Sequence, residues 1–217
     1  VGGTTAVTAT GADITLTNAA NSLAGAISFT GANVALTNTK ATTLAASTAT
    51  GTLVVTSSNA ISQTGALTSG GNATFTGTDI TLTNVRNSFG GTVGFTGANV
   101  ALFDSTALAL AASTATGTLA ATSTAAITQT GALAVTGNAA FTGTDITLTN
   151  ALNTFGGTVA FTGANVAVTD STALSVAASS ATGTLALTSG GALTQTGALT
   201  VGGNATLNAT GNILLTN

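Results

Sequence analysis

The stretch TGTDITLTN at residues 76–84 occurs again at 142–150, and the near-identical TGADITLTN stands at 10–18. A constant 66-residue period separates successive copies. A fixed period of this kind is typical of repeat proteins, in which one supersecondary unit buries its apolar face only when a neighbour stacks on it. The sequence therefore predicts a repeat fold, with units at about 10–75, 76–141 and 142–208.

A Thr-Gly pair marks a shorter interval inside each unit. Two 20-residue intervals between successive pairs are followed by a 26-residue interval, and the series then repeats. Such an interval suits one coil of short strands joined by tight corners, and it is too short for a βαβ crossover with a second strand. The spacing predicts coils of about 20 residues, grouped three to a 66-residue repeat. The threonines of the pairs are Thr10, Thr30, Thr50, Thr76, Thr96, Thr116, Thr142, Thr162 and Thr182.

Apolar residues alternate after each glycine, as in Ile14 and Leu16 or Ile80 and Leu82. This period of two indicates a strand with one buried face. Aligning the Thr-Gly pairs predicts columns of side chains that contact one another inside the stack of coils. The column two residues before the glycine reads Ala9, Phe29, Ala49, Phe75, Phe95, Ala115, Phe141, Phe161 and Ala181.

The outward positions carry columns of short polar residues. One begins Asp13, Asn33 and Thr52, and another closes the strand with asparagine, aspartate or serine. Side chains stacked at the strand spacing of about 4.8 Å can bond to one another as well as to their own turns. We therefore predict structural ladders from the threonines of the Thr-Gly pairs and from Asn18, Asn38, Asn84 and Asn150.

The composition agrees with an all-β parallel β-helix, or β-solenoid. The 217 residues include no proline, which would remove a donor from any ladder that it entered. Charged residues make up 3% of the chain, against about 25% in ordinary domains. The Ile, Leu, Val and Phe columns nevertheless supply a continuous core, which argues against disorder. No run approaches the ~20 apolar residues of a membrane helix, so membrane insertion is not expected.

The chain offers little for catalysis or for cofactors. Cysteine and histidine are absent, which removes metal sites of the His/Cys type and thiol or imidazole chemistry. Asp13, Asp79 and Asp145 recur at the repeat, and three coils would separate them by roughly 14 Å. A glycosidase carboxylate pair needs about 5–9.5 Å. We expect no enzyme, no catalytic residue, no metal and no cofactor, and a polysaccharide-processing β-helix is the least favoured alternative.

Every third coil is longer by six residues and contains a Gln-Thr-Gly sequence at Gln63, Gln129 and Gln195. These glutamines either satisfy a longer side of the coil or form a ridge for lateral contacts between rods. Lys40 and Arg86 are the only basic residues, in a chain of net charge −3. This charge is too negative for binding to nucleic acid or to an anionic membrane.

The motif G-x-[DN]-[IV]-x-[LV]-[TF]-[ND], seen in GTDITLTN at 77–84 and GANVALFD at 97–104, resembles the coils of filamentous-haemagglutinin-like adhesins and autotransporter passengers of Gram-negative bacteria. The resemblance covers the whole chain. It implies a right-handed parallel β-helix that presents a rigid rod at the cell surface, and it carries over no functional residue.

These observations predict one continuous solenoid over 1–217, without polar caps and belonging to a longer array. The expected function is that of a non-catalytic extracellular rod, either the shaft of a surface adhesin or a filament. Its partners would be further coils, joined end to end or side by side, and a host-surface or matrix ligand. Ice binding is the alternative, because Thr15-Leu16-Thr17 and its two copies resemble a Thr-x-Thr array, although the alignment places it in one coil of three.

Overall fold

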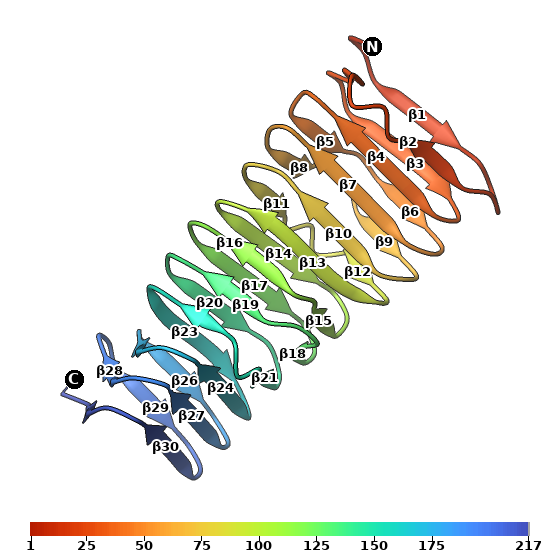
Figure 1. Ribbon diagram of the computed structural model, residues 1–217. Coiled ribbons are helices and arrows are strands. Elements are labelled where there is room, and N and C mark those ends of the chain that lie inside the picture. The colour runs from red at the N-terminus through yellow and green to blue at the C-terminus, as the bar shows by residue number, and fades with distance from the viewer. Residues whose placement is uncertain (217) are drawn as a thin grey trace. The chain divides into compact units, whose positions relative to one another are not determined.

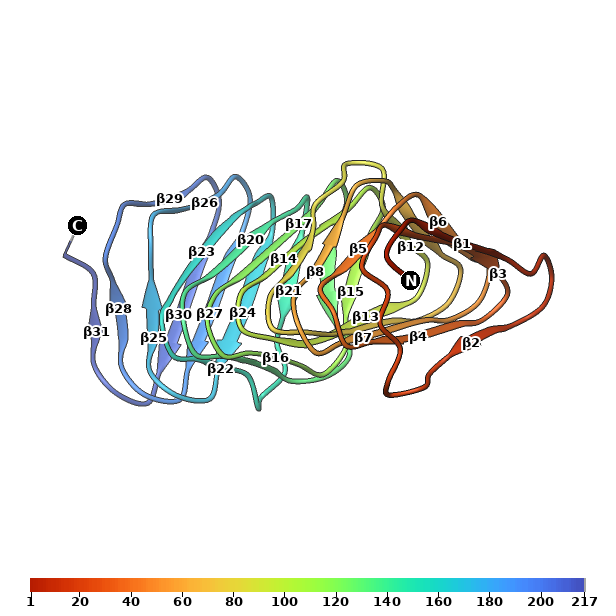
Figure 2. The same cartoon turned by 90° about the horizontal axis from the view of Figure 1, so that it is seen from above.

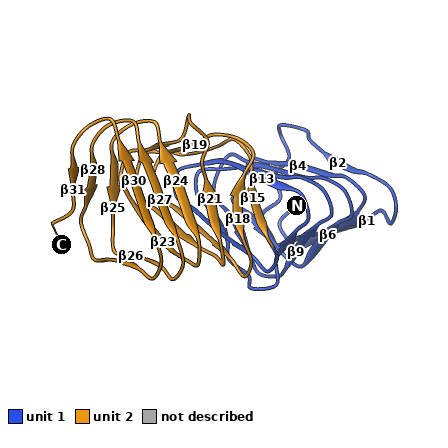
Figure 3. Cartoon of the chain, turned by 90° about the horizontal axis from the view of Figure 1, so that it is seen from below, with its two compact units in different colours: residues 1–106 blue, residues 107–217 orange. Residues whose placement is uncertain are grey.

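The computed structural model describes residues 1–216, which form two compact units at residues 1–106 and 107–216 (Figure 3). In both units the described residues form strands and turns without a helix. Each unit is a parallel β-solenoid with coils of about 20 residues, so the predicted fold class is confirmed (Figure 1). That the two units form one continuous solenoid of right-handed coils stays a prediction.

Three stacks of parallel strands build unit 1 (Figure 2). The first stack holds β1 (Thr5–Thr8), β3 (Ile27–Gly31), β6 (Ser47–Ala49), β9 (Leu67–Ser69) and β12 (Ser88–Phe89). The second holds β2 (Ile14–Leu16), β4 (Val34–Asn38), β7 (Leu53–Ser57), β10 (Ala73–Thr76) and β13 (Thr92–Gly97). The third holds β5 (Thr42–Leu44), β8 (Ile61–Gln63), β11 (Ile80–Leu82) and β14 (Val100–Asp104). The chain visits the stacks in turn, so three strands make one coil.

Unit 2 repeats this arrangement. One stack runs through β15 (Leu108–Leu110), β18 (Ile127–Gln129), β21 (Ile146–Leu148), β24 (Val166–Asp170), β27 (Leu185–Ser189) and β30 (Ala205–Ala209). Another holds β17 (Leu119–Ser123), β20 (Ala139–Thr142), β23 (Thr158–Gly163), β26 (Ser179–Ala181) and β29 (Leu199–Val201). The remaining strands are β16 (Ser113–Ala115), β19 (Leu133–Val135), β22 (Thr154–Phe155), β25 (Leu174–Val176), β28 (Leu193–Gln195) and β31 (Ile213–Leu214).

The 66-residue repeat does not contain a whole number of coils. Strands β4 and β14 are ten strands apart and hold equivalent positions in successive repeats, yet β4 lies in the second stack of unit 1 and β14 in the third. In unit 2, β20 and β30 are likewise ten strands apart and lie in different stacks. Ten strands at three per coil make three coils and one further strand. Each repeat therefore moves its motifs on to the next side of the coil.

This shift corrects the column that groups Ala49 with Phe75. Phe75 pairs with Val55 in the coil before it and with Phe95 in the coil after it. Ala49 pairs instead with Gly31 and Ser69. The physical reason is that the 26-residue interval spans a coil and about one third, so the next Thr-Gly pair lies on another side.

The inward faces of the strands form a dry core. Seven phenylalanines are the largest buried side chains, namely Phe29, Phe75, Phe89, Phe95, Phe141, Phe155 and Phe161. Phe75 packs edge to face on Phe89 with ring centroids 5.9 Å apart, and Phe141 packs in the same way on Phe155 at 6.0 Å. Such pairs add about 0.5–1.5 kcal/mol beyond the burial of their area. The alternation in the sequence thus correctly predicted which side chains point inward.

Two glycines show why corners between coils need this residue. Gly11 has φ of +73°, in the left-handed region that glycine adopts without a steric penalty. A Cβ added to Gly65 would overlap the backbone nitrogen of Ala46 in the preceding coil. Gly65 therefore allows two coils to approach closely at the Gln-Thr-Gly corner.

Candidate functional site

The second stack of unit 1 contains a ladder of threonines, but only part of it was expected. Thr76 and Thr96 are paired, as the alignment predicted. Their ladder also includes two threonines that belong to no Thr-Gly pair, and it reads Thr37, Thr56, Thr76 and Thr96 over four successive coils.

The other threonines of the Thr-Gly pairs in unit 1 do not stack on one another. Thr30 belongs to a hydroxyl ladder of the first stack, which reads Thr8, Thr30, Thr48, Thr68 and Ser88. Thr10 and Thr50 lie at corners outside the strands. Thr30 pairs with Thr8 on one side and with Thr48 on the other, at unequal distances along the chain, so a constant spacing misplaces its neighbours.

Unit 2 shows the same division. Thr142 pairs with Thr162, and their ladder comprises Thr122, Thr142, Thr162, Ser180 and Thr200. Thr116 and Thr182 lie at corners outside the strands. In both units the ladders follow the coil-to-coil register rather than the Thr-Gly spacing.

An exposed ladder of three polar side chains links successive coils at the start of the strands. In unit 1, Asn33 donates to Asp13 Oδ1 from its backbone N at 3.0 Å and from Nδ2 at 2.9 Å. Thr52 donates to Asn33 Oδ1 from its backbone N and from Oγ1, both at 3.0 Å. An ionised carboxylate accepts hydrogen bonds but has none to donate. Aspartate can therefore occupy only the first position of this series, where it accepts from the next coil.

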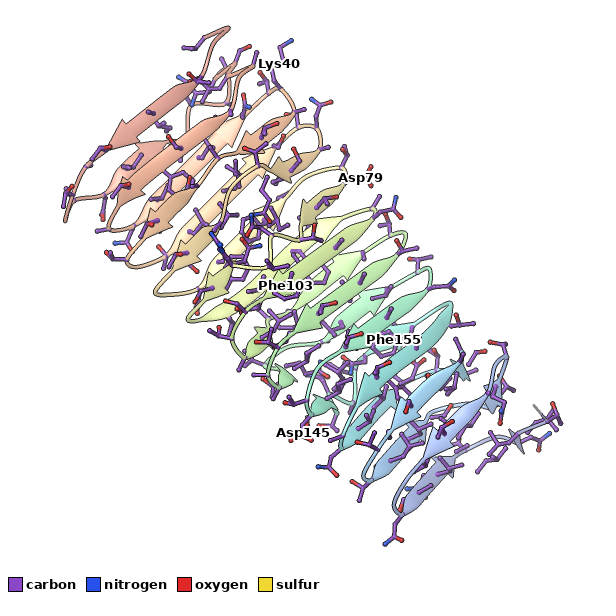
Figure 4. The ribbon with its side chains drawn as sticks, turned by 180° about the vertical axis from the view of Figure 1, so that it is seen from behind. Lys40, Asp79, Phe103, Asp145 and Phe155 are labelled. Atoms are coloured by element: carbon purple, nitrogen blue, oxygen red, sulfur yellow. The ribbon has the colours of Figure 1, made fainter. Side chains whose placement is uncertain are left out.

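Unit 2 contains the same ladder. Asn165 donates to Asp145 Oδ1 from backbone N and Nδ2 at 3.0 Å, and Thr184 donates to Asn165 Oδ1 at 3.1 and 2.9 Å. The side chain of Asp145 lies at the outside of its coil, as that of Asp79 does in unit 1 (Figure 4). We call each Asp-Asn-Thr series the exposed ladder.

Gln63 and Gln129 are engaged within their own units. Gln63 Oε1 accepts from Asn87 Nδ2 at 2.8 Å, and Gln63 Nε2 donates to Asn87 Oδ1 at 2.8 Å. Nε2 also donates to the carbonyl of Gly65 at 2.6 Å. Gln129 makes the equivalent reciprocal pair with Asn153, again at 2.8 Å. These bonds engage the glutamines within their own turns and coils, as the first of the two interpretations expected. The prediction that every third coil is longer by six residues is wrong, because successive coils through Leu53, Ala73 and Val93 are each 20 residues long.

The partner asparagines were missed from the sequence. Asn87 and Asn153 are both 0% exposed, and each accepts the backbone N–H of a core leucine, Leu67 or Leu133, at 2.9 Å. The available signal was that each asparagine follows its glutamine at the same interval in both repeats. The third glutamine, Gln195, donates to the carbonyl of Gly197 at 3.1 Å.

All four predicted asparagines bond to the backbone of their own turns, Asn38 through a longer bond of 3.3 Å from Lys40 N. Asn18, Asn84 and Asn150 each accept, through Oδ1, the backbone N–H two residues later at 2.8 to 2.9 Å. This is the local asparagine turn that competes with regular structure. These three side chains therefore shape corners, whereas the fourth asparagine also connects coils.

Asn38 is that fourth residue, and it is 0% exposed. Its Oδ1 accepts from Leu23 N at 2.9 Å, while Nδ2 donates to Leu23 O at 2.9 Å and to Thr42 Oγ1 at 3.1 Å. We call this arrangement the buried corner. It joins strand β4 to the preceding coil through both backbone groups of one residue.

Asp104 and Asp170 occupy the equivalent positions in later repeats and are 0% and 1% exposed. Oδ1 of each accepts from the backbone N and the hydroxyl of the threonine two residues later, at 2.8 to 2.9 Å. The Oδ2 atoms of both aspartates are buried without a hydrogen-bond partner. Burial raises the pKa of the Asp104 carboxyl above 3.8, although hydrogen bonds from Thr106 and Phe89 act in the opposite direction.

The ionisable residues are dispersed. Asp13 precedes strand β2 in the second stack, whereas Asp79 precedes β11 in the third, so these two carboxylates lie on different sides of unit 1. The expectation that they stand above one another in a single column is therefore wrong. Within residues 1–216, no group of three acidic, histidine or cysteine residues could hold a metal ion.

The repeats themselves match a known family model, described as Repeats of unknown function (DUF5649), over residues 1–30, 31–96, 97–162 and 163–217. The chain belongs to this family of repeats. Residues 31–96 contain strands β4 to β13, and residues 97–162 contain β14 to β23, so each complete DUF5649 repeat supplies ten strands. No curated protein and no solved structure matches the chain. Among residues 1–216, no helix is long and apolar enough to cross a membrane.

Proposed function

We propose that these DUF5649 repeats form a non-catalytic structural rod, the shaft of a secreted surface adhesin or an extracellular filament of a Gram-negative bacterium. One observation carries the proposal: the polar side chains of the predicted columns and of the Gln-Thr-Gly corners are in large part bonded to their own turn or to a neighbouring coil. In unit 1 the exposed ladder, the hydroxyl pair of Thr43 and Ser62 and the Gln63–Asn87 pair all do this. Side chains used in this way stabilise stacking and are not assembled into a reaction centre.

The shift of motifs between stacks supports a spacer rather than a one-sided binding protein. In unit 1 the turn at Asn18 follows a strand of the second stack, and the equivalent turn at Asn84 follows a strand of the third. Equivalent surface turns of successive repeats therefore lie on different sides of the coil. A ligand-binding ridge along one side would require the opposite, namely identical residues in one stack at every repeat.

Resistance to extension follows from the same contacts. Parallel strands bond each coil to the coils before and after it, and the Phe75–Phe95 register continues the core through them. Because each coil contacts only its neighbours, the stability of the array is approximately the sum of the contributions of its coils and of the contacts between them. Further coils can therefore be added without weakening those already present. We propose that the partners are further coils of the same kind, joined end to end or side by side, and a host-surface or matrix ligand bound elsewhere.

The test is an antibody raised against residues 1–217, used on intact and on lysed cells of the source bacterium. Labelling of intact cells, or of material shed into the medium, is expected. Denaturing electrophoresis of that material separates the two forms of the proposal. A band on the order of several hundred kilodaltons indicates a shaft, and a band near 20.3 kDa indicates an assembled filament. Antigen found only after lysis would contradict both forms.

A second candidate function, ice binding, is supported by the threonine ladder of unit 1. Thr37, Thr56, Thr76 and Thr96 follow one another in four consecutive coils. The adjacent outward column is less regular, because it contains Ala35, Val54, Thr74 and Gly94. One continuous row of hydroxyl and methyl groups is therefore present, and a two-dimensional array is not.

An ice-recrystallisation assay on the purified chain tests this candidate. If it binds ice, crystals should stay small, and Thr56→Lys in the centre of the row should abolish the effect. Thr68→Lys, in the first stack of the same unit, is the matched control. Growth of ice crystals equal to that in buffer alone would remove ice binding from consideration.

A further inference from the structure

Asp104 is a buried carboxyl group at a corner where the preceding repeat has an amide. Asn38 ends strand β4 and Asp104 ends strand β14 one repeat later, and both are 0% exposed. An ionised carboxylate in such a place is costly unless its oxygens are hydrogen-bonded. The surroundings of its second oxygen therefore decide the charge of Asp104.

Equivalent hydrogen bonds show that the two side chains have the same orientation. Asn38 Oδ1 accepts from Leu23 N at 2.9 Å and from Lys40 N at 3.3 Å. Asp104 Oδ1 accepts from Phe89 N at 3.4 Å and from Thr106 N at 2.9 Å. Phe89 and Thr106 hold the positions in the next repeat that correspond to Leu23 and Lys40.

The second terminal atom of each side chain must then lie in the same place. In Asn38 this atom is Nδ2, which donates to the carbonyl oxygen of Leu23 at 2.9 Å. In Asp104 it is Oδ2, which is buried and has no hydrogen-bond partner. The corresponding carbonyl is that of Phe89, an acceptor that an ionised oxygen cannot bond and would repel.

We propose that Asp104 is a proton-binding site: in the folded chain the neutral carboxyl group donates a hydrogen bond from Oδ2 to the carbonyl oxygen of Phe89. The proton comes from solvent and returns to solvent when the corner ionises. Protonation restores at Asp104 the bond that Asn38 makes with Nδ2, so this corner of unit 1 holds its two coils together more firmly in acid.

A neighbouring cation does not take the place of the proton at Asp104 Oδ2. Arg86 is the nearest cation along the chain, but it is exposed, and Asp104 Oδ2 has no bond to it. On the adjacent strand β11, the nearest ionisable residue is Asp79, which precedes the strand at the opposite end and is exposed. The causes that act on the pKa of Asp104 are burial, which raises it, and the bonds from Thr106 and Phe89, which lower it.

The sign of the pH dependence follows from the raised pKa. A group whose pKa is higher in the folded state than the unfolded value of 3.8 contributes stability that is fully present below 3.8. That contribution is lost as the pH rises through the folded value. The corner should therefore loosen between acid and neutral pH.

Carbon-detected NMR of the aspartate carboxyl groups tests the proposal on the chain of residues 1–217. The Asp104 Cγ resonance, assigned by its loss in Asp104→Asn, should titrate with a midpoint above 3.8. A midpoint for Asp104 at or below 3.8 would overturn the proposal.

Hydrogen exchange supplies a second readout that does not depend on global unfolding. The protection factors of the Ser105 amide, which donates to the carbonyl oxygen of Asn87 in the preceding coil at 2.8 Å, should fall in the native chain as the pH rises through the Asp104 titration. They should stay level in Asp104→Asn, which keeps a donor at all pH values, and they should fall as in the native chain in Asp79→Asn. The same fall in Asp104→Asn would mean that another group is responsible.

Discussion

Unit 1 has short polar side chains of the same kinds in two contrasting settings. One is the exposed ladder of Asp13, Asn33 and Thr52, and the other is the buried corner of Asn38. In the exposed ladder every bond competes with water, so its net contribution is small. In the buried corner the Asn38 side chain is 0% exposed and its bonds to Leu23 are partly shielded from water, so each group left unpaired there costs on the order of 1 kcal/mol or more. The comparison teaches that burial, rather than the number of bonds, decides which polar residues hold the coils in register.

The largest expected effect is that of Asn38→Ala, which removes both bonds to Leu23 and leaves the half-buried N–H and C=O groups of that residue without their partner. The free energy of unfolding should fall by about 2–4 kcal/mol. Guanidinium denaturation followed by far-ultraviolet circular dichroism measures the loss. Asn84→Ala, which loses only a bond in an exposed turn, should lower the free energy of unfolding by about 1 kcal/mol or less. Equal losses in the two variants would contradict the conclusion that burial decides the contribution of these side chains.

Asn38→Asp should have the next largest effect, because it reproduces at Asn38 the arrangement of Asp104. We expect a loss of about 1–3 kcal/mol at neutral pH and a smaller loss in acid, where a protonated carboxyl can donate to Leu23 O. Denaturation at both pH values gives the difference. An identical loss in acid and at neutral pH would show that the missing donor is not the cause.

In unit 2, Asp170→Asn should stabilise. Its Oδ2 is buried without a partner, and an amide nitrogen in that place would supply the missing donor while Oδ1 keeps its bonds to Thr172. The expected gain at neutral pH is about 1 kcal/mol, measured by the same denaturation. The comparison variant is Asp145→Asn in the exposed ladder of the same unit, and a decrease in stability for Asp170→Asn would refute the assignment of Oδ2 as unsatisfied.

The smallest effect should come from Asp79→Asn in unit 1. Asp79 Oδ1 accepts from Asn99 N and Nδ2 at 3.0 Å, and an asparagine retains that oxygen. The free energy of unfolding, measured by the same denaturation, should change by no more than about 0.5 kcal/mol. A large loss would mean that the bonds from Asn99 need a negative charge at residue 79 as well as an acceptor.

Much of the fold could be predicted because its signals are local. The alternation at Ile80 and Leu82 identified a strand and its buried face, and both residues are 0% exposed. The exposed ladder was also foreseen, since Asp13, Asn33 and Thr52 do lie in adjacent coils. The neighbours across the 26-residue interval could not be predicted, because the residues between Leu53 and Ile80 fill one coil and a third, and Ala73 takes the place above Leu53.

The candidate site divides in the same way. Own-turn bonds of Asn84 and Asn150 involve residues two positions apart, so residue type was sufficient to expect them. The pairing of Gln63 with Asn87 depends on where one coil ends and the next begins, and the alignment did not contain that information.

By itself the sequence determined the class of fold, because strand propensity, a period of two and the absence of proline act within a few residues of one chain. It also determined the 66-residue repeat and the near-absence of charge. Only the tertiary structure decided which strands lie on one another, since register depends on the lengths of corners distributed over a whole coil. That register makes ten strands, and not nine, fill each repeat, and it buries Asp104 where a neighbouring repeat has an amide.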